Sequence, residues 1–278
     1  NGRVSPSVPP VSLQRPMLVT LDTAAIVRES AVAVVARPQF AEPAHLRVHR
    51  AGDAGDAERL AEFGARLTTS SQQNPAGRDT REFVASLVRG PLVAALAHVH
   101  YTLLIEGVSR SLTATLRQRA PMLSVTGTSH RYLDESQLQF VLPPALAGDE
   151  ALESTWSAQM AETARAYHAL VQALMTRYGW VNDKVQRRRM AREGAAALLP
   201  QCLATTLLVS GNVPAWRQLL ATSGGEGAER EWRRVVVSLA RVLRDEAPAL
   251  FADVSIVRGS DQLDMVQLMP TEPAGDAP

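Results

Sequence analysis

Apolar residues recur along the chain with two different periods. Runs with an apolar residue at every third or fourth position predict helices at residues 56–66, 79–88, 109–119, 150–178, 185–199, 215–220 and 229–244. Short runs rich in apolar and β-branched residues predict strands at 98–105, 140–142 and 203–209. Because helices alternate with short strands, the pattern predicts a chain of the α/β class.

Region 150–178 has the longest helical pattern. Its stripe consists of Trp156, Met160, Thr163, Tyr167, Leu170 and Leu174. Side chains at this spacing lie on one face of a helix, so we interpret the stripe as core and not as a cofactor site. Pro121 ends the preceding helix, and Asn182 or Asp183 can cap the following one.

The two ends of the chain differ from its central part. Residues 1–44 contain a proline-rich lead and two apolar runs, 17–26 and 31–36, that are typical of a strand pair. An exposed strand pair needs a cover, which either a neighbouring subunit or the sheet of the same chain can supply. The predicted organisation is an N-terminal extension at 1–44, a main domain at 45–258 and a polar tail at 259–278.

Composition argues against several classes of protein. The 278 residues carry 29 basic and 28 acidic side chains, a balance that does not favour binding to a nucleic acid polymer or a membrane surface. No apolar run reaches the length of a membrane span, and the first residues lack a signal-peptide pattern, so we expect a cytoplasmic protein. Cys202 is the single cysteine, so we predict no internal disulfide and no metal site.

Region 101–132 has the pattern of an anion-binding site. It joins a strand, a helix that ends in Arg117 and Arg119, and the turn Ser129-His130-Arg131-Tyr132. Arginine supplies a permanent charge and a planar fork of donors, and the serine and the histidine amide add short-range donors. Two arginines at a helix end are by themselves typical of a solvated surface, but the turn favours a phosphate site.

This region resembles the flavin-dependent thymidylate synthases. Members carry an Ile-x-Gly-Ile/Val-Ser-Arg segment, an Arg-His-Arg triplet and a Ser-x-Arg-Tyr turn. These appear here as 105–110, Arg117-Gln118-Arg119 and 129–132. Further matches follow in the same order, at Leu199-Pro200, Ser210-Gly211-Asn212, Ala215-Trp216-Arg217 and 248–253. The resemblance covers roughly residues 45–257.

The resemblance implies both a fold and a reaction. The fold is one of helices packed on a curved, mixed or antiparallel sheet, assembled as a homotetramer with active sites at subunit junctions. The reaction is reductive methylation of carbon-5 of a uridylate nucleotide, UMP or dUMP, with FAD as cofactor, methylenetetrahydrofolate as methylene donor and NADPH as reductant. The family uses no enzyme cysteine, so we interpret Cys202 as a structural thiol and not as a nucleophile.

The resemblance also implies site residues. The nucleotide would contact Thr115, Leu116, Arg117, Gly127, Thr128, Ser129, His130 and Arg131, with Arg110 and Arg192 as further phosphate partners. FAD would contact Arg117, Gln118 and Arg119 and, from another subunit, Asn212 and Gln218. Surface ion pairs explain Arg110 and Arg192 at least as well. No catalytic side chain is identified.

Several positions depart from the family pattern. The central histidine of the triplet is Gln118, and an alignment shifted by one residue places Gln118-Arg119-Ala120 there. The acidic or amide residue two places before the motif serine is Gly127. A phosphate-binding arginine falls on Ala196, one turn from Arg192, which could replace it.

Two hypotheses remain. In one, the site is rebuilt for UMP, as in the uridylate carbon-5 methylase of polyoxin biosynthesis: Gly127 makes room for the 2′-hydroxyl, and Thr126 or Thr128 bonds it. In the other, the chain is a nucleotide-binding protein that has lost methyl transfer, because the arginine expected to face the uracil is Ser223. A DNA-binding helix bundle built on the arginines of 187–192 lacks a generally basic surface.

Overall fold

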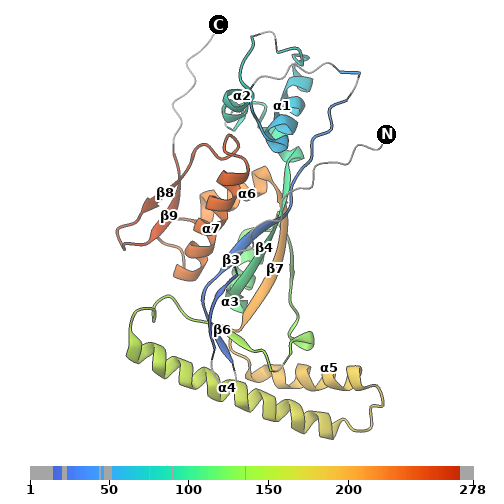
Figure 1. Cartoon of the computed structure of the whole chain (residues 1–278), viewed down its shortest axis with the longest axis vertical. Helices are drawn as coiled ribbons and strands as arrows, with labels where there is room; N and C mark the ends of the chain where they lie inside the picture. Colours follow the sequence, from blue (N-terminus) through green and yellow to red (C-terminus); the bar gives the residue numbers. More distant parts are fainter. Residues whose placement is uncertain are drawn as a thin grey trace.

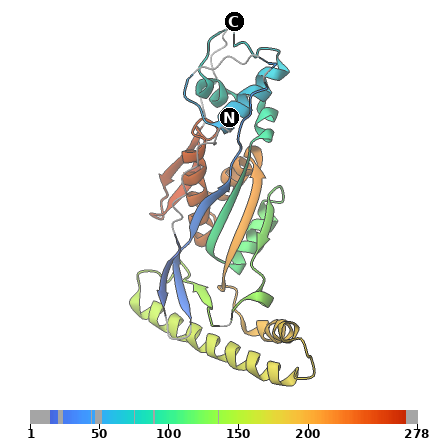
Figure 2. The same ribbon diagram turned by 45° about the vertical axis from the view of Figure 1, so that its right-hand side comes forward.

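The structure, a computed structural model of the chain, describes residues 15–20, 24–43, 45–46, 52–74, 76–88, 90–134 and 136–269. The molecule is elongated, with a four-stranded sheet in its middle (Figure 1). Helices α1 (Asp56–Thr68) and α2 (Thr80–Leu87) form one end, and α4 (Glu150–Arg177) and α5 (Lys184–Ala195) form the other (Figures 1 and 2). The predicted α/β class is confirmed.

The main sheet is antiparallel throughout. Its strands lie in the order β3 (Ala31–Ala36), β4 (His100–Ser109), β7 (Ala204–Asn212) and β5 (Ser124–Gly127). The register of β4 shifts at Gly107, whose φ of 70° is in the left-handed region that glycine tolerates. After this bulge, β4 ends opposite the first residue of β7.

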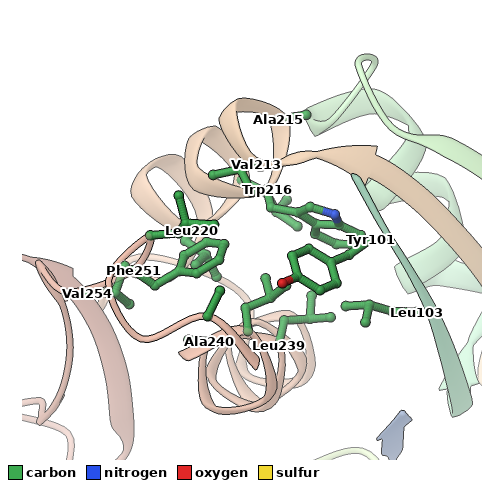
Figure 3. Close-up of a cluster of buried hydrophobic side chains, with 14 of the residues drawn as sticks. Tyr101, Leu103, Val213, Ala215, Trp216, Leu220, Leu239, Ala240, Phe251 and Val254 are labelled. Carbon is green, nitrogen blue, oxygen red and sulfur yellow. The ribbon is translucent and has the colours of Figure 1, made fainter. Parts of the chain in front are cut away.

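Helices α6 (Val213–Ser223) and α7 (Arg230–Glu246) pack against this sheet and form the main hydrophobic core. Figure 3 shows Tyr101 of β4 beside Trp216 of α6, with Leu239 of α7 next to them. These side chains are buried because alternate residues of a strand point to the same face, where the apolar helix faces cover them.

An ion pair fixes the segment that follows α7 to α6. The guanidinium of Arg217 donates to both carboxylate oxygens of Asp253, at 2.8 and 2.7 Å, and to the carbonyl of Leu250 at 2.9 Å. A bidentate, largely buried pair of this kind has well-defined geometry. Two of the matched segments, 215–217 and 248–253, therefore hold the scaffold together.

A second hydrophobic core joins the sheet region to α4 and α5. Strand β2 (Ala25–Glu29) pairs antiparallel with β1 (Met17–Thr20) and parallel with β6 (Gln139–Val141). Residues of β2 and β6 pack on the apolar stripe of α4, where Met160 and Tyr167 are buried. The interpretation of this stripe as core is confirmed.

The predicted pairing of the two N-terminal apolar runs with each other is wrong. Strand β1 pairs with β2, whereas the second run forms β3, the edge strand of the main sheet, paired with β4. Strand β3 takes this position because it buries Ala31, Ala33 and Val34, and Val34 is part of the main core. Residues 25–36 thus extend the sheets of their own chain, while a contact of the exposed β1 with a neighbouring subunit stays a prediction.

The sequence pattern does not predict three of the strands, β5, β8 (Val254–Arg258) and β9 (Asp264–Leu268). Strands β8 and β9 pair antiparallel, and the N–H of Val266 donates to the carbonyl of Gly224 at 3.0 Å. The prediction of a tail from residue 259 is therefore wrong as far as β9, because Val266 is buried there. Residues 270–278 lie outside the described part.

The seven predicted helices are all present, with ends shifted by a few residues. Asp183 caps α5, and a 3-10 turn at Ala196–Leu198 follows it. Another 3-10 turn at Val93–His98 precedes β4, so that strand begins two residues later than predicted. Among the described residues, no helix is both long and apolar enough to cross a membrane.

Candidate functional site

Helix α3 (Arg110–Arg119) begins at the end of β4, where Ser109 caps it. The Ser109 hydroxyl accepts a hydrogen bond from the N–H of Leu112 at 3.0 Å, and the N–H of Arg110 donates to the carbonyl of Leu203 at 3.1 Å. These bonds hold Arg110 beside the start of β7. Its Nη1 lies 3.3 Å from Nδ1 of His130, so the first residue of α3 contacts the Ser-x-Arg-Tyr turn.

The turn forms a single 3-10 turn, η2 (His130–Tyr132), which Ser129 caps. The N–H of Thr128 donates to the carbonyl of Thr206 in β7 at 3.1 Å, which fixes the turn to the main sheet. The guanidinium of Arg131 reaches α5 and pairs with Glu193 at 2.9 Å. A hydroxyl, an imidazole and a guanidinium are therefore gathered within one turn of chain.

Two cavities lie where this turn meets α5. One has a volume of about 250 Å³ and the other of about 400 Å³, and Arg131 and Arg189 line both. The Nε atoms of these two arginines are buried and have no hydrogen-bond partner within the described part of the chain. Buried donors are rarely left without an acceptor, so the two side chains fit a bound anion.

The charge of this cluster comes from arginine and not from histidine. Burial lowers the pKa of His130 below its ordinary 6.5, and the positive charges of Arg110 and Arg131 lower it further, whereas Glu193 raises it. The imidazole is therefore neutral at pH 7. Because Nδ1 accepts from the Arg110 guanidinium, Nε2 carries the proton and can donate to a ligand.

Arg192 belongs to the same cluster. It lines the larger cavity together with Arg188. Hydrogen bonds from Ser136 lower the pKa of Asp134, and the charges of Arg192 and Arg188 lower it further. Arg192 thus lies between the cavity and a surface carboxylate, a position that fits both its predicted phosphate role and a surface interaction.

The triplet Arg117-Gln118-Arg119 lies at the other end of α3, on its exposed last turn. The side chain of Leu123, which follows α3, occupies the space beside Gly211, where a Cβ would be 2.2 Å away. This end of α3 therefore lies next to the last residues of β7. No ion pair of Arg117 or Arg119 occurs within the described residues, so both guanidinium groups can meet a ligand.

Asn212 ends β7 and caps α6, accepting a hydrogen bond from the N–H of Ala215 at 3.0 Å, and Gln218 is exposed on α6. Asn212 is six residues from Thr206, to which the motif turn is bonded, along β7. At about 3.3 Å per residue this is roughly 20 Å. The structure thus brings Arg110 and the motif turn together at one end of the sheet and places Arg119 and Asn212 near the other. Arg117, predicted to contact both ligands, lies toward the second end.

Two predicted nucleotide contacts on α3 need different treatment. The side chain of Leu116 is 1% exposed and packs in the main core, so the prediction that it lines the nucleotide pocket is wrong for its side chain. It faces inward because Leu112, one turn earlier, does so as well. Thr115 is half-buried, and its hydroxyl donates to the carbonyl of Ser111 at 3.3 Å.

The predicted reason for Gly127 is also wrong. A Cβ at this position would lie 2.8 Å from Cδ2 of Leu207, a fully buried residue of β7. The glycine therefore allows close packing of β5 on β7, and the space that it leaves is filled within the chain. Thr126 and Thr128 are both exposed on either side of it.

The set of predicted site residues does not include Arg189. Its guanidinium lies 5.0 Å above the ring of Tyr132, the last residue of the motif. The spacing of Arg188, Arg189 and Arg192 gives a sequence signal, since residues three and four apart share a helix face. The thiol of Cys202 packs on the second hydrophobic core: burial raises its pKa to about 11, and it contacts Sδ of Met160 at 3.6 Å.

Comparison with known proteins identifies the family of this chain. Residues 52–249 match the family described as thymidylate synthase complementing protein. The chain is 31% identical over 232 residues to the flavin-dependent thymidylate synthase of Mycobacterium avium, a match that covers 83% of this chain and 92% of the relative. The chain belongs to the flavin-dependent thymidylate synthase family. The enzyme of Mycobacterium leprae is 32% identical over 236 residues and has the same coverage.

A solved structure shares the fold of this family member. The crystal structure of a UMP/dUMP methylase, PolB, from Streptomyces cacaoi bound with 5-Br dUMP superposes with a TM-score of 0.57. The match covers 82% of this chain and 95% of PolB, at 16% sequence identity. At this identity the match shows a shared fold.

Proposed function

We propose that this chain reductively methylates carbon-5 of a uridylate nucleotide. In this reaction, a methylene unit from methylenetetrahydrofolate would replace the hydrogen on carbon-5, which leaves as a proton. Reduced FAD would supply the hydride that completes the methyl group, and tetrahydrofolate would be released. NADPH is the expected source of that hydride. The observation that carries the proposal is the cluster of Arg110, Ser129, His130 and Arg131 beside an arginine-lined cavity, in a chain of this family.

The nucleotide phosphate fits at Arg131. Its guanidinium has one outer nitrogen on Glu193, while its buried Nε has no partner in the described structure. A phosphate can accept from that Nε and from Ser129, and it can also accept from His130. Arg110 of α3 and Arg192 of α5 add positive charge. Thr115 lies five residues after Arg110 on α3. The phosphate would anchor the nucleotide while its base extends away from α5.

FAD fits the opposite end of the sheet. Arg117 and Arg119 expose guanidinium groups for its phosphates, and Gln118, Asn212 and Gln218 can contact polar edges of the cofactor. When bound, the flavin supplies hydride transfer, which no side chain of the protein can perform. The protein's part is to hold the cofactor and to exclude water from the reacting carbon.

The phosphate cluster at Arg131 and the predicted FAD residues Arg119 and Asn212 lie roughly 20 Å apart along β7. Hydride transfer requires contact between flavin and uracil, so within one subunit the two ligands would have to span that distance. We propose that the FAD residues of one subunit meet the nucleotide residues of another in a homotetramer. The separation of the sets in this chain supports that assembly.

We propose that UMP is accepted in preference to dUMP or alongside it. The exposed hydroxyl groups of Thr126 and Thr128 are the candidates for bonding the 2′-hydroxyl, since the space at Gly127 is filled by Leu207. The fold shared with PolB, described as a UMP/dUMP methylase, supports this choice.

A nucleotide-binding protein without methyl transfer is the second candidate. Ser223, at the position of the uracil-facing arginine, is 1% exposed and precedes Gly224, which is bonded to β9. The buried hydroxyl of Ser223 cannot take the place of that arginine. The proposed enzyme would therefore need another group to stabilise the ionised uracil.

An anaerobic assay tests both candidates. The purified chain is mixed with reduced FAD, methylenetetrahydrofolate and either UMP or dUMP. The molecular masses of the products are then measured by mass spectrometry. We expect a gain of one methyl group, larger for UMP. Nucleotide binding without any methylated product would instead establish the second candidate.

The phosphate assignment is tested by measuring the affinity for UMP. Arg131→Ala should weaken UMP binding roughly 10- to 100-fold, because it removes a charge-assisted contact to a dianion. Arg165→Ala, which removes an exposed arginine paired with Glu162 on α4, serves as the control and should bind UMP normally. Equal affinity of the Arg131 variant and the wild type would refute the assignment.

A further inference from the structure

The larger cavity beside the motif turn is more basic than one phosphate requires. Its volume is about 400 Å³, and six cationic side chains line it, namely Arg131, Lys184, Arg187, Arg188, Arg189 and Arg192. No carboxylate is among the described residues of its lining. The remaining lining is apolar or aromatic, with Tyr132 exposed at its edge.

The cations extend along α5. Lys184 and Arg192 are eight residues apart, which corresponds to about 12 Å of helix. A single phosphate group accepts from two or three donors within a few ångströms of each other. One nucleotide phosphate at Arg131 therefore does not engage all the cations of this lining.

Two of these side chains have capacity for a ligand. Arg189 places its guanidinium over Tyr132 and has a buried Nε without a partner among the described residues, and it forms no ion pair there. Lys184 is exposed and likewise has no ion pair within the described residues. Arg187, by contrast, donates to the carbonyls of Val181 and Gly179 and so belongs to the turn between α4 and α5.

We propose that this cavity binds a chain of closely spaced anionic groups carried by a second ligand, next to the single phosphate of the nucleotide. Such a chain is found in the glutamyl carboxylates of a folate donor or in a run of phosphates. Lys184 and Arg189 bind these anionic groups, and the ring of Tyr132 packs against the guanidinium of Arg189. The inference rests on the proposed function only for the position of the nucleotide phosphate.

The experiment measures binding of two probes to the full chain, a pentaglutamate peptide and tripolyphosphate, by calorimetry at fixed salt. We expect the wild type to bind at least one of them, and Lys184→Gln/Arg189→Gln to lose at least tenfold in affinity. The probe that binds more tightly identifies carboxylates or phosphates as the source. The control variant Arg165→Gln should bind both probes as the wild type does, and circular dichroism checks that each variant is folded.

UMP affinity is measured in parallel. We expect it to change less than threefold in Lys184→Gln alone, because this residue lies outside the motif turn. A tenfold loss of UMP affinity in that variant would assign Lys184 to the nucleotide site and overturn the inference. So would unchanged probe binding in the double variant, an equal loss in the control, or equally tight binding of a single-stranded oligodeoxynucleotide, which would mark a general polyanion surface.

The two proposals fail separately. Wild-type protein that binds UMP but neither probe refutes the anionic-chain site alone. Protein that binds a probe but gives no methylated nucleotide refutes the proposed reaction and leaves this site standing.

Discussion

At the scale of single residues, the start of α3 depends on a carboxylate from α7. Glu231 accepts a hydrogen bond from the N–H of Ser109 at 2.8 Å, and Ser109 in turn caps α3. Burial raises the pKa of Glu231 above its ordinary 4.5, although the bond from Ser109 lowers it. Arg110 follows Ser109 directly, so this carboxylate supports the position of a residue in the predicted phosphate site.

The raised pKa predicts how folding stability changes with pH. The folded chain keeps the Glu231 proton over a range above pH 4.5 in which the unfolded chain has lost it. The contribution of this group to stability is therefore complete below pH 4.5 and is lost as pH rises through the folded pKa. Glu231→Gln keeps an acceptor for Ser109 but does not titrate, so its stability relative to the wild type should increase between pH 4.5 and 7.

Urea denaturation at a series of pH values measures this difference. Gln172→Ala, which changes an exposed residue of α4 that does not titrate, is the control and should show a difference that is constant with pH. A constant difference for Glu231→Gln as well would show that Glu231 has an ordinary pKa.

At the scale of secondary structure, one glycine allows strands of the two sheets to approach each other closely. Gly107 forms the bulge of β4 with a φ of 70°, and a Cβ there would lie 2.8 Å from Cγ1 of Val27 in β2. The bulge lets β4 approach β2 while it stays paired with β3 and β7.

Gly107→Ala should therefore destabilise the fold. The left-handed conformation costs an alanine about 1–2 kcal/mol, and the contact with the fully buried Val27 adds to this. Gly227→Ala, at an exposed position with open space around its Cβ, should change stability by less than about 0.5 kcal/mol. Denaturant titration of both variants checks the prediction, and equal stabilities would contradict the role assigned to the bulge.

The elements differ in how far the sequence predicts them. Periodicity predicts the helices, because α4 and α7 bury one long stripe each. It does not predict which strand pairs with β3, since pairing depends on contacts between residues distant in sequence. Strand β9 is missed because Asp264 and Gln267 give it a polar composition, and only Val266 is buried.

The candidate site shows the same division. The motif turn at 129–132 is predicted because a short contiguous pattern carries it. The contribution of Arg189 is not, because it depends on how α5 packs against η2 and appears only in the position of Tyr132. The filled space beside Gly127 is likewise a property of Leu207 on another strand.

At the scale of the whole molecule, the decisive feature is the separation of the two predicted ligand sets. Arg131 belongs to a cluster at one end of the sheet, and Arg119 and Asn212 lie at the other, roughly 20 Å away along β7. In the proposed assembly, two subunits share each site, and this would bring the two sets together. Any symmetric assembly that joins the two ends of the sheet would do the same.

Mixing two inactive variants tests this arrangement. Arg131→Ala should lose nucleotide binding, and Arg119→Ala should lose FAD binding, so each alone should give little methylated product. If every site combines the two sets from different subunits, co-assembly in equal amounts should leave about a quarter of the sites intact and restore that share of activity. Sites built within one subunit would all carry a defect, and mixing would restore nothing. Activity is measured after co-expression with different affinity tags, with mass measurement confirming mixed oligomers, and a mixture of separately assembled variants that are not allowed to exchange subunits is the control.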